Sequence, residues 1–294
     1  MSVPFPETVQ HLIQNDRSLA ELTWLGIGGP SRYFAEPSTS EQLAELVRAA
    51  HQHSIPIRII GSGSNLLVRE SGFDGLVISL SSAAFGTITV DGRHLRAGAG
   101  AKLGQVITSA VGAGLGGLEN LAGVPGTVGG AVTGNAEAGG GDIGSQVENV
   151  QILASDGTFR RLERGDLQFS HRKSNLAGLL VTGVEFLLEP TDVVALTKRL
   201  QKLWIVAQNQ RPVDEPRVAQ PFIDPDGFSV ADLIQATGLS GVRLGNASLA
   251  TSNSRYVLAH SGATSDDVTQ LLQRIQNQVS QQAGIDLQLN LQIW

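Results

Sequence analysis

The spacing of apolar residues predicts a chain that mixes helices with strands. A capping-box pattern at 38–41 precedes a predicted helix whose apolar residues recur at helical spacing, namely Leu43, Leu46, Val47 and Ala50. A longer helix is predicted after Thr264, with a buried stripe of Val268, Leu271, Leu272, Ile275 and Val279. Further helices are predicted at 102–111, 193–206 and 229–236, and strands at 57–60, 75–80, 87–90, 94–97, 150–154, 159–162 and 179–188.

The C-terminal residues from Ile285 to Trp294 alternate strictly between apolar and polar. This pattern predicts a half-buried strand whose polar face includes Asn290. Four prolines between 208 and 225 indicate a domain boundary in that stretch. We therefore expect a mixed α/β fold with more than one domain.

Composition excludes several kinds of site and partner. The chain has no cysteine, which removes disulfides, thiolate metal ligands and cysteine nucleophiles. A net charge of −6 with scattered basic residues argues against a nucleic-acid partner. No apolar run is long enough to span a membrane, and the N-terminus lacks the pattern of a signal peptide. We expect a cytoplasmic protein with no membrane partner and no metal site.

Glycine is enriched, and its clusters are the candidate ligand-binding segments. The 35 glycines in 294 residues make up roughly 12% of the chain, against a usual ~7%. The 112–117 segment matches the dinucleotide pattern G-x-G-x-x-G, but a predicted helix precedes it where a strand is required. The GSGSN turn at 61–65 follows a predicted strand, so it suits either a pyrophosphate cradle or a simple tight turn. The run at 123–130 with 134–136 favours backbone lying against a ligand over a plain surface loop.

His171-Arg172 precedes an apolar strand and is the candidate for charge recognition. An arginine at the end of a polar turn can clamp a carboxylate, although an exposed surface arginine would have the same pattern.

Several of these segments together resemble the UDP-N-acetylenolpyruvoylglucosamine reductase family, the flavoenzymes of peptidoglycan precursor synthesis. The resemblance covers 22–294. It depends on LGIGGP at 25–30, GSGSNLL at 61–67, AGVPGTVGGAV at 122–132 with GNA at 134–136, HRKS at 171–174, LIQATGLSG at 233–241 and GAT at 262–264.

The resemblance implies a two-part FAD-binding unit of the vanillyl-alcohol oxidase and p-cresol methylhydroxylase type, followed by a C-terminal α/β substrate-binding domain. The implied domains are 1–80, 81–206 and 207–294. The implied enzyme is an oxidoreductase in which NADPH reduces FAD and hydride then passes to the enolpyruvyl double bond. The product would be UDP-N-acetylmuramate. The partner is a UDP-sugar, and the oligomeric state stays open.

The same resemblance implies the site residues. Arg172 falls on the family's catalytic arginine, which stabilises the enolate-like charge. The implied FAD-binding residues are Gly61, Ser62, Gly63, Ser64, Asn65, Leu66, Gly123, Val124, Gly126, Thr127, Gly129, Gly130, Asn135 and Ala136.

Two implied catalytic positions depart from the family pattern. Gln220 stands where the family has a serine or cysteine proton donor, and a glutamine amide is too weak an acid for that task. Asn290 stands where the family has a glutamate, unless the final strand is shifted by two residues. In addition, His171 replaces a tyrosine, and Asp224 replaces an asparagine and adds negative charge.

Three hypotheses follow from these matches and departures. The first is a working reductase that uses Arg172 with water or another donor, for which His171 and the serines of 248–254 are candidates. The second is an FAD-binding homologue that has lost the reaction and binds or reduces something else. The third, a flavin oxidase acting on another alcohol or sugar, is disfavoured because the C-terminal segment resembles the reductase.

Overall fold

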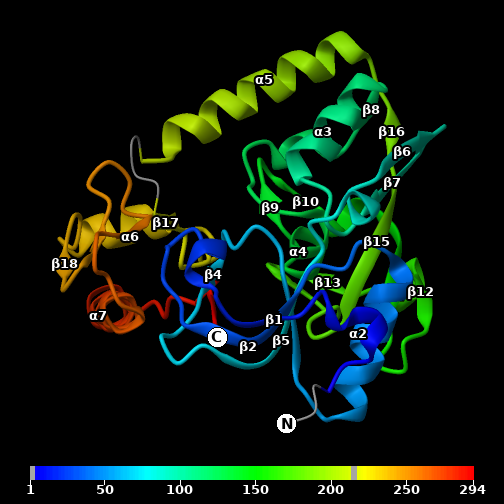
Figure 1. The fold of residues 1–294 in the computed structure, drawn as a ribbon. Coiled ribbons are helices and arrows are strands. Elements are labelled where there is room, and N and C mark those ends of the chain that lie inside the picture. The colour runs from blue at the N-terminus through cyan, green and yellow to red at the C-terminus, as the bar shows by residue number, and fades with distance from the viewer. Residues whose placement is uncertain (1–3, 213–216) are drawn as a thin grey trace. The chain divides into compact units, whose positions relative to one another are not determined.

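The computed structural model describes residues 4–212 and 217–294, which form two compact units. Unit 1 comprises residues up to 16 together with 32–61 and 74–208. Unit 2 comprises 17–31, 62–73 and 209–294. The chain therefore passes between the units several times, and unit 2 is assembled from segments that lie far apart in the sequence (Figure 1).

The helices are α1 (Glu7–Gln10), α2 (Ser40–Gln52), α3 (Leu103–Gly112), α4 (Val128–Thr133), α5 (Val193–Gln210), α6 (Val230–Ala236) and α7 (Ser265–Ala283). The strands are β1 (Gln14–Ser18), β2 (Pro30–Ala35), β3 (Ile57–Ile60), β4 (Leu66–Leu67), β5 (Phe73–Ser79), β6 (Ile88–Asp91), β7 (His94–Gly98), β8 (Leu115–Gly116), β9 (Glu137–Ala138), β10 (Gly141–Asp142), β11 (Val147–Leu153), β12 (Phe159–Glu163), β13 (Phe169–Ser170), β14 (Lys173–Ser174), β15 (Leu180–Leu187), β16 (Glu189–Pro190), β17 (Val218–Ala219), β18 (Arg243–Leu244), β19 (Ala247–Leu249), β20 (Val257–Ala259) and β21 (Gln292–Ile293).

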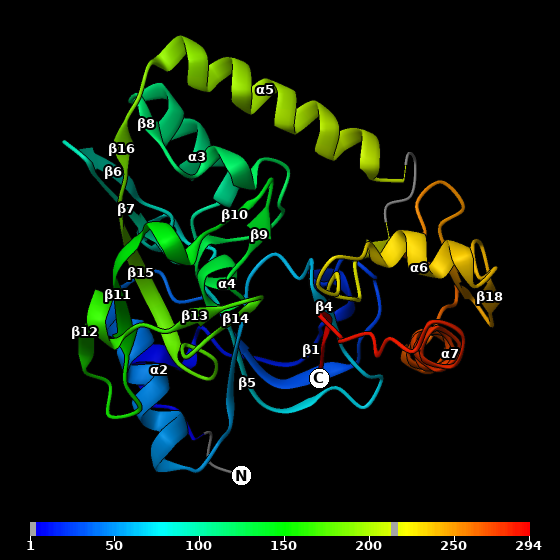
Figure 2. The same ribbon diagram turned by 180° about the vertical axis from the view of Figure 1, so that it is seen from behind.

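The main sheet of unit 1 has the order β12-β11-β15-β7-β6, with antiparallel neighbours throughout. Its central strand β15 is buried from Leu180 to Phe186, as expected for a continuous apolar run. Helices α3 and α4 pack against this sheet, and α5 runs beyond α3 (Figure 2). The predicted strands of this region are confirmed, with ends that differ by up to three residues.

A second sheet, most of which belongs to unit 1, has the order β1-β2-β5-β3. Helix α2 buries the predicted apolar residues of its inner face. Its N-terminal cap differs from the prediction. Thr39 caps the helix by accepting from the Gln42 N–H at 3.3 Å, whereas the Ser38 hydroxyl bonds the Gln42 side chain. The cap lies one residue later because Thr39 has the extended backbone that a capping residue needs.

Unit 2 is built on the antiparallel sheet β17-β20-β19-β18. One face packs on α6 and α7, and the predicted stripe of α7 is buried there in full. Thr264 and Asp267 form a capping box at the start of α7, and Gly284 ends the helix with a φ of +67°. The opposite face of the sheet carries a small apolar cluster of Val218, Ala250, Tyr256 and Leu258, against which Trp24 packs.

The predicted strand at 285–294 is wrong for most of its length. Only Gln292–Ile293 forms a strand, β21, which pairs in parallel with β4. Leu289, predicted to be buried, is 40% exposed. The alternation fails because the segment changes partners. The Gln288 carbonyl accepts from Ile223 N–H at 3.0 Å, before the chain continues to β4.

Candidate functional site

The GSGSN turn connects β3 to β4, and its geometry depends on glycine. Gly63 has a φ of +64°, and a β-carbon there would lie 1.9 Å from the Leu22 carbonyl oxygen. The Ser62 hydroxyl is buried and has no hydrogen-bond partner among the described residues. A buried hydroxyl without a partner is costly, so it suits a ligand oxygen that can accept its hydrogen. This orphaned donor is what the predicted pyrophosphate cradle requires.

The turn is linked directly to the segment that contains Asn290. The Asn65 side chain donates to the Asn290 carbonyl at 2.7 Å, and the Asn290 side chain approaches Asn65 Oδ1 at 3.5 Å. The Asn290 N–H donates to the carbonyl of Pro221 at 2.7 Å. Three predicted site positions, Asn65, Gln220 and Asn290, therefore lie within one hydrogen-bonded neighbourhood of unit 2.

Gln220 contacts a tyrosine that sequence reasoning did not identify. Its Nε2 donates to Tyr256 Oη at 2.6 Å. Tyr256 is 9% exposed and belongs to the apolar cluster on the face of the β17–β20 sheet that lies opposite α6 and α7. No motif marks this tyrosine, and only the pairing of β17 with β20 brings it to Gln220.

Asp224 was expected to add negative charge near the substrate. In the structure Arg255 Nη2 forms an ion pair with Asp224, and the other carboxylate oxygen accepts from Val230 N–H at 2.9 Å. The extra charge is therefore balanced within unit 2 and helps to hold the start of α6.

The predicted residues of unit 1 gather around α4. Thr127 precedes the helix, and a β-carbon on Gly61 would lie 2.6 Å from Thr127 Oγ1. The N–H groups of Val128 and Gly129 donate to Ala101 and Ala99, both at 2.9 Å. These two donors are therefore used by the protein, and the remaining predicted members, Val124, Gly126, Gly130 and Ala136, lie along the same loop and helix.

Some predicted cofactor residues have a clear structural role. Asn135 is buried with a φ of +41°. Its Nδ2 donates to Ser170 O at 2.8 Å, and its Oδ1 accepts from Gly144 N–H at 3.0 Å. Gly123 has a φ of +82°, and a β-carbon there would lie 2.3 Å from the Cβ of Ala207 in α5. These residues hold the loop in place, whatever further contact they make with a ligand.

Arg172 lies at the tip of the β13–β14 hairpin, where its φ is +54°. Glu137 holds it through several contacts. The carboxylate accepts the Arg172 backbone N–H at 2.8 Å, and the Glu137 carbonyl accepts from Arg172 Nη2 at 2.8 Å. His171 Nδ1 also lies 2.7 Å from the same carboxylate. Glu137 directly follows the GNA motif, but a lone glutamate gives no sequence signal for this role.

Hydrogen bonds at the start of α7 lower the pKa of two carboxyl groups in unit 2. The backbone N–H of Thr264 donates to Asp267 and is the main cause of its lowered pKa. Burial alone would raise the pKa of Glu70, but hydrogen bonds from Ser265 lower it overall. Asp267 lies in the first turn of α7, and Glu70, four residues after Leu66, accepts hydrogen bonds from Ser265 at the start of that helix.

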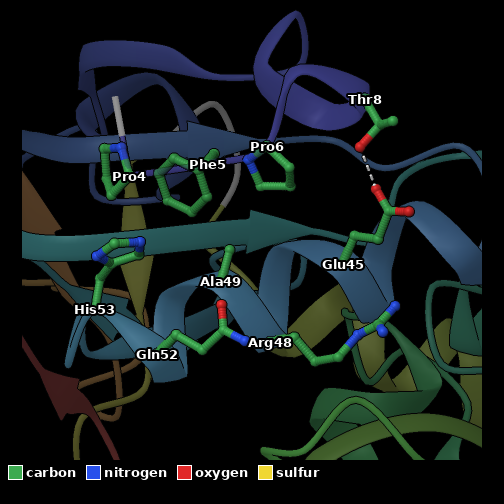
Figure 3. Close-up of a pocket in the computed structure, with 9 residues that line it drawn as sticks. All are labelled: Pro4, Phe5, Pro6, Thr8, Glu45, Arg48, Ala49, Gln52 and His53. Carbon is green, nitrogen blue, oxygen red and sulfur yellow. Dashed lines mark hydrogen bonds between the residues drawn. The ribbon is translucent and has the colours of Figure 1, made fainter. Parts of the chain in front are cut away.

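A cavity of about 470 Å³ lies in unit 1 between the N-terminal segment and α2 (Figure 3). The Thr8 hydroxyl donates to Glu45 at its edge, at 2.5 Å. None of the predicted site residues lines it. Within residues 4–212 and 217–294, no group of three metal-ligating side chains was found, and none of the helices has both the length and the apolar character needed to cross a membrane.

Proteins named as reductases are similar in sequence to nearly the whole of this chain. The UDP-N-acetylenolpyruvoylglucosamine reductase of Rhodopirellula baltica is 50% identical over 290 residues, which is 99% of this chain and 95% of that protein. The chain belongs to the UDP-N-acetylenolpyruvoylglucosamine reductase family. The reductase of Moorella thermoacetica is 35% identical and covers 96% of this chain and 93% of its own. The predicted family is therefore confirmed.

Family descriptions and solved structures agree with this reductase assignment. Residues 31–163 match the family described as an FAD binding domain, and residues 211–294 match the C-terminal domain of the reductase. The crystal structure of the Thermus caldophilus reductase aligns with a TM-score of 0.82 at 31% identity, covering 96% of this chain and 98% of its own. Cholesterol oxidase from Brevibacterium sterolicum shares the fold alone, with a TM-score of 0.52 and 19% identity over 65% of this chain and 40% of its own. The predicted fold class is confirmed.

Proposed function

We propose that this protein reduces UDP-N-acetylenolpyruvoylglucosamine to UDP-N-acetylmuramate with NADPH and FAD, a step of peptidoglycan precursor synthesis. The kinship over 99% of the chain supports this reaction. The single structural observation that favours it most is the hydrogen-bonded link from Asn65 through Asn290 to Pro221. That link joins the glycine turn to the segment of Gln220 inside one unit, as a shared cofactor and substrate site requires.

The cofactor would be held by the glycine-rich segments. In unit 2 the buried Ser62 hydroxyl and the turn through Leu66 would contact the pyrophosphate. In unit 1 the loop from Gly123 to Gly130, with Asn135 and Ala136, is the other segment predicted to bind FAD. FAD bound there would supply the hydride chemistry, with NADPH as the reductant and the substrate double bond as the acceptor.

Arg172 would stabilise the negative charge that hydride addition leaves beside the substrate carboxylate. The bond from Arg172 Nη2 to the Glu137 carbonyl would hold the guanidinium before substrate arrives, which lowers the reorganisation needed during the reaction. Its side chain is partly exposed at 26%, so it is accessible to a ligand. The cytoplasmic location of the protein and the contacts between the other predicted residues and FAD stay predictions.

The decisive experiment separates the two half-reactions by anaerobic stopped-flow absorbance. FAD-loaded protein is first reduced with NADPH and then mixed with UDP-N-acetylenolpyruvoylglucosamine. Prompt reoxidation of the flavin is the expected result. Flavin that stays reduced would contradict the proposal and favour the alternative, an FAD-binding homologue that has lost this reaction. None of the relatives named above favours that alternative, and neither does any contact within the described residues.

Uptake of FAD is tested on its own. The purified protein should be yellow or should bind added FAD, read from the quenching of flavin fluorescence. A colourless protein that does not bind added FAD would contradict the proposal, and no experiment with substrate would then be needed.

A further inference from the structure

We propose that the phenol of Tyr256 is the proton donor of this reductase and that Gln220 holds it in position. The inference rests on the proposed function and goes beyond it, because the position predicted to donate the proton is a glutamine. Gln220 Nε2 donates to Tyr256 Oη at 2.6 Å. A tyrosine is an established type of general acid, whereas an amide is not.

The fold fixes this pair in place. Val218 pairs with Leu258 and Ala219 with Val257, so the next position along β17 brings Gln220 opposite Tyr256. The ring of Tyr256 is 9% exposed and packs with Val218, Ala250 and Leu258. A buried ring with one hydrogen-bonded oxygen has little freedom to move, which suits a positioned acid.

The hydrogen bond leaves the proton of Tyr256 available. Gln220 is the donor in this bond, so the phenol oxygen acts as the acceptor. Among residues 4–212 and 217–294, no acceptor takes the hydroxyl hydrogen of Tyr256. The same amide N–H would stabilise the negative charge on the oxygen after the proton has left.

A series of hydrogen bonds and chain links connects Tyr256 to the proposed cofactor turn. Its partner Gln220 precedes Pro221, whose carbonyl accepts from the Asn290 N–H. The Asn290 carbonyl in turn accepts from the Asn65 side chain of the GSGSN turn. The phenol is therefore connected to that turn entirely within unit 2.

The proposed step balances without a further reagent. Hydride, which the NADPH-reduced flavin of the proposed function would supply, adds to the terminal carbon of the enolpyruvyl double bond, and the π electron pair moves to the carbon that bears the carboxylate. That carbon takes the hydroxyl proton of Tyr256, and the O–H electron pair stays on the phenol oxygen. Water returns a proton to the phenolate before the next turnover.

The first test is Tyr256→Phe, which keeps the buried ring and removes only the hydroxyl. Substrate-driven reoxidation of the reduced flavin should slow by about 100-fold or more, because a positioned acid contributes that much. Flavin reduction by NADPH and FAD affinity, read from fluorescence quenching, should stay as in the wild type. A loss below about tenfold would overturn the proposal, as would equal slowing of both half-reactions.

Gln220→Leu tests the positioning role. Alone it should slow reoxidation less than Tyr256→Phe does, because the phenol remains. Combined with Tyr256→Phe it should cause no further loss, since two residues that act as one unit are not additive. Additive losses would show that the two side chains act independently and would overturn the pairing.

Substrate-driven reoxidation of the wild-type flavin distinguishes a failure of this proposal from a failure of the proposed function. Wild-type flavin that substrate does not reoxidise contradicts both. Wild-type flavin that is reoxidised, together with an unaffected Tyr256→Phe variant, contradicts only the role of Tyr256.

Discussion

The backbone of Gly123 lies so close to α5 that a β-carbon there would come within 2.3 Å of the Cβ of Ala207. Both residues belong to unit 1, so the glycine loop and α5 are packed against each other through this contact. Gly123 was predicted to bind the cofactor, and this packing gives it a second reason to be glycine. The two reasons can be separated by experiment.

Gly123→Ala should lower the free energy of unfolding by about 1–3 kcal/mol more than Gly140→Ala, because only the first forces a clash. The two positions have nearly equal φ angles, +82° and +81°, but a β-carbon at Gly140 would meet nothing within 4 Å. Urea unfolding of the two variants measures the difference. Equal losses of unfolding free energy in the two variants would contradict this prediction, because they would show that α5 shifts to accommodate the added methyl group without a cost in stability.

Asn65→Ala should destabilise the protein by about 1 kcal/mol and weaken FAD binding, because it removes the 2.7 Å bond to the Asn290 carbonyl. Asn290→Ala is the matched control. It keeps the main-chain carbonyl and loses only the 3.5 Å side-chain contact. Thermal unfolding and flavin titration should rank Asn65→Ala as the more damaging change, and the reverse order would refute the importance of this bond.

Arg172→Lys should slow substrate-driven reoxidation of flavin by about 100-fold and leave reduction by NADPH unchanged. A lysine lacks the planar fork that reaches both Glu137 and a ligand. Lys173→Ala, at an exposed neighbour in the same hairpin, is the control and should leave both rates unaltered. The two half-reactions are measured separately by stopped-flow absorbance.

Asp267 should make the stability of unit 2 depend on acid pH. Its pKa is lowered in the fold, so its stabilising effect is present above the unfolded pKa of about 4 and is lost as the pH falls through the folded value. Asp267→Ala should lower the free energy of unfolding near pH 7 and change it much less at the acid end, because it removes the carboxylate of the capping box. Urea unfolding across pH 3–7 tests this, with the exposed Asp266→Ala as control. A cost that does not change with pH would refute it.

Helix α7 could be predicted in detail because its signals are local. The Thr264 and Asp267 capping box and the buried stripe act within one helix, at separations of three and four residues. Helix α4 could not be predicted in the same way. Its sequence is rich in glycine and β-branched residues, and its first N–H groups bond to carbonyls of 99 and 101.

The site was predictable only where a motif marks it. The GSGSN turn and Arg172 stand in recognisable segments, whereas Glu137 and Tyr256 contact the predicted site residues Arg172 and Gln220 from about 35 residues away. Those partners are set by strand pairing and by the folding of the hairpin onto β9. The final segment departs from its prediction because the apolar–polar alternation continues in sequence while the pairing partner changes near Asn290. The domain limits at 80 and 206 stay predictions.

The bond between Asn65 and Asn290 joins positions 225 residues apart. During translation at about 5–20 residues per second, the ribosome would need roughly 10 to 45 s to make the second partner after the first. The nascent chain therefore holds the GSGSN turn without its neighbour for most of its synthesis. A flavin that needs the completed turn must be loaded late, after the C-terminal segment has left the exit tunnel.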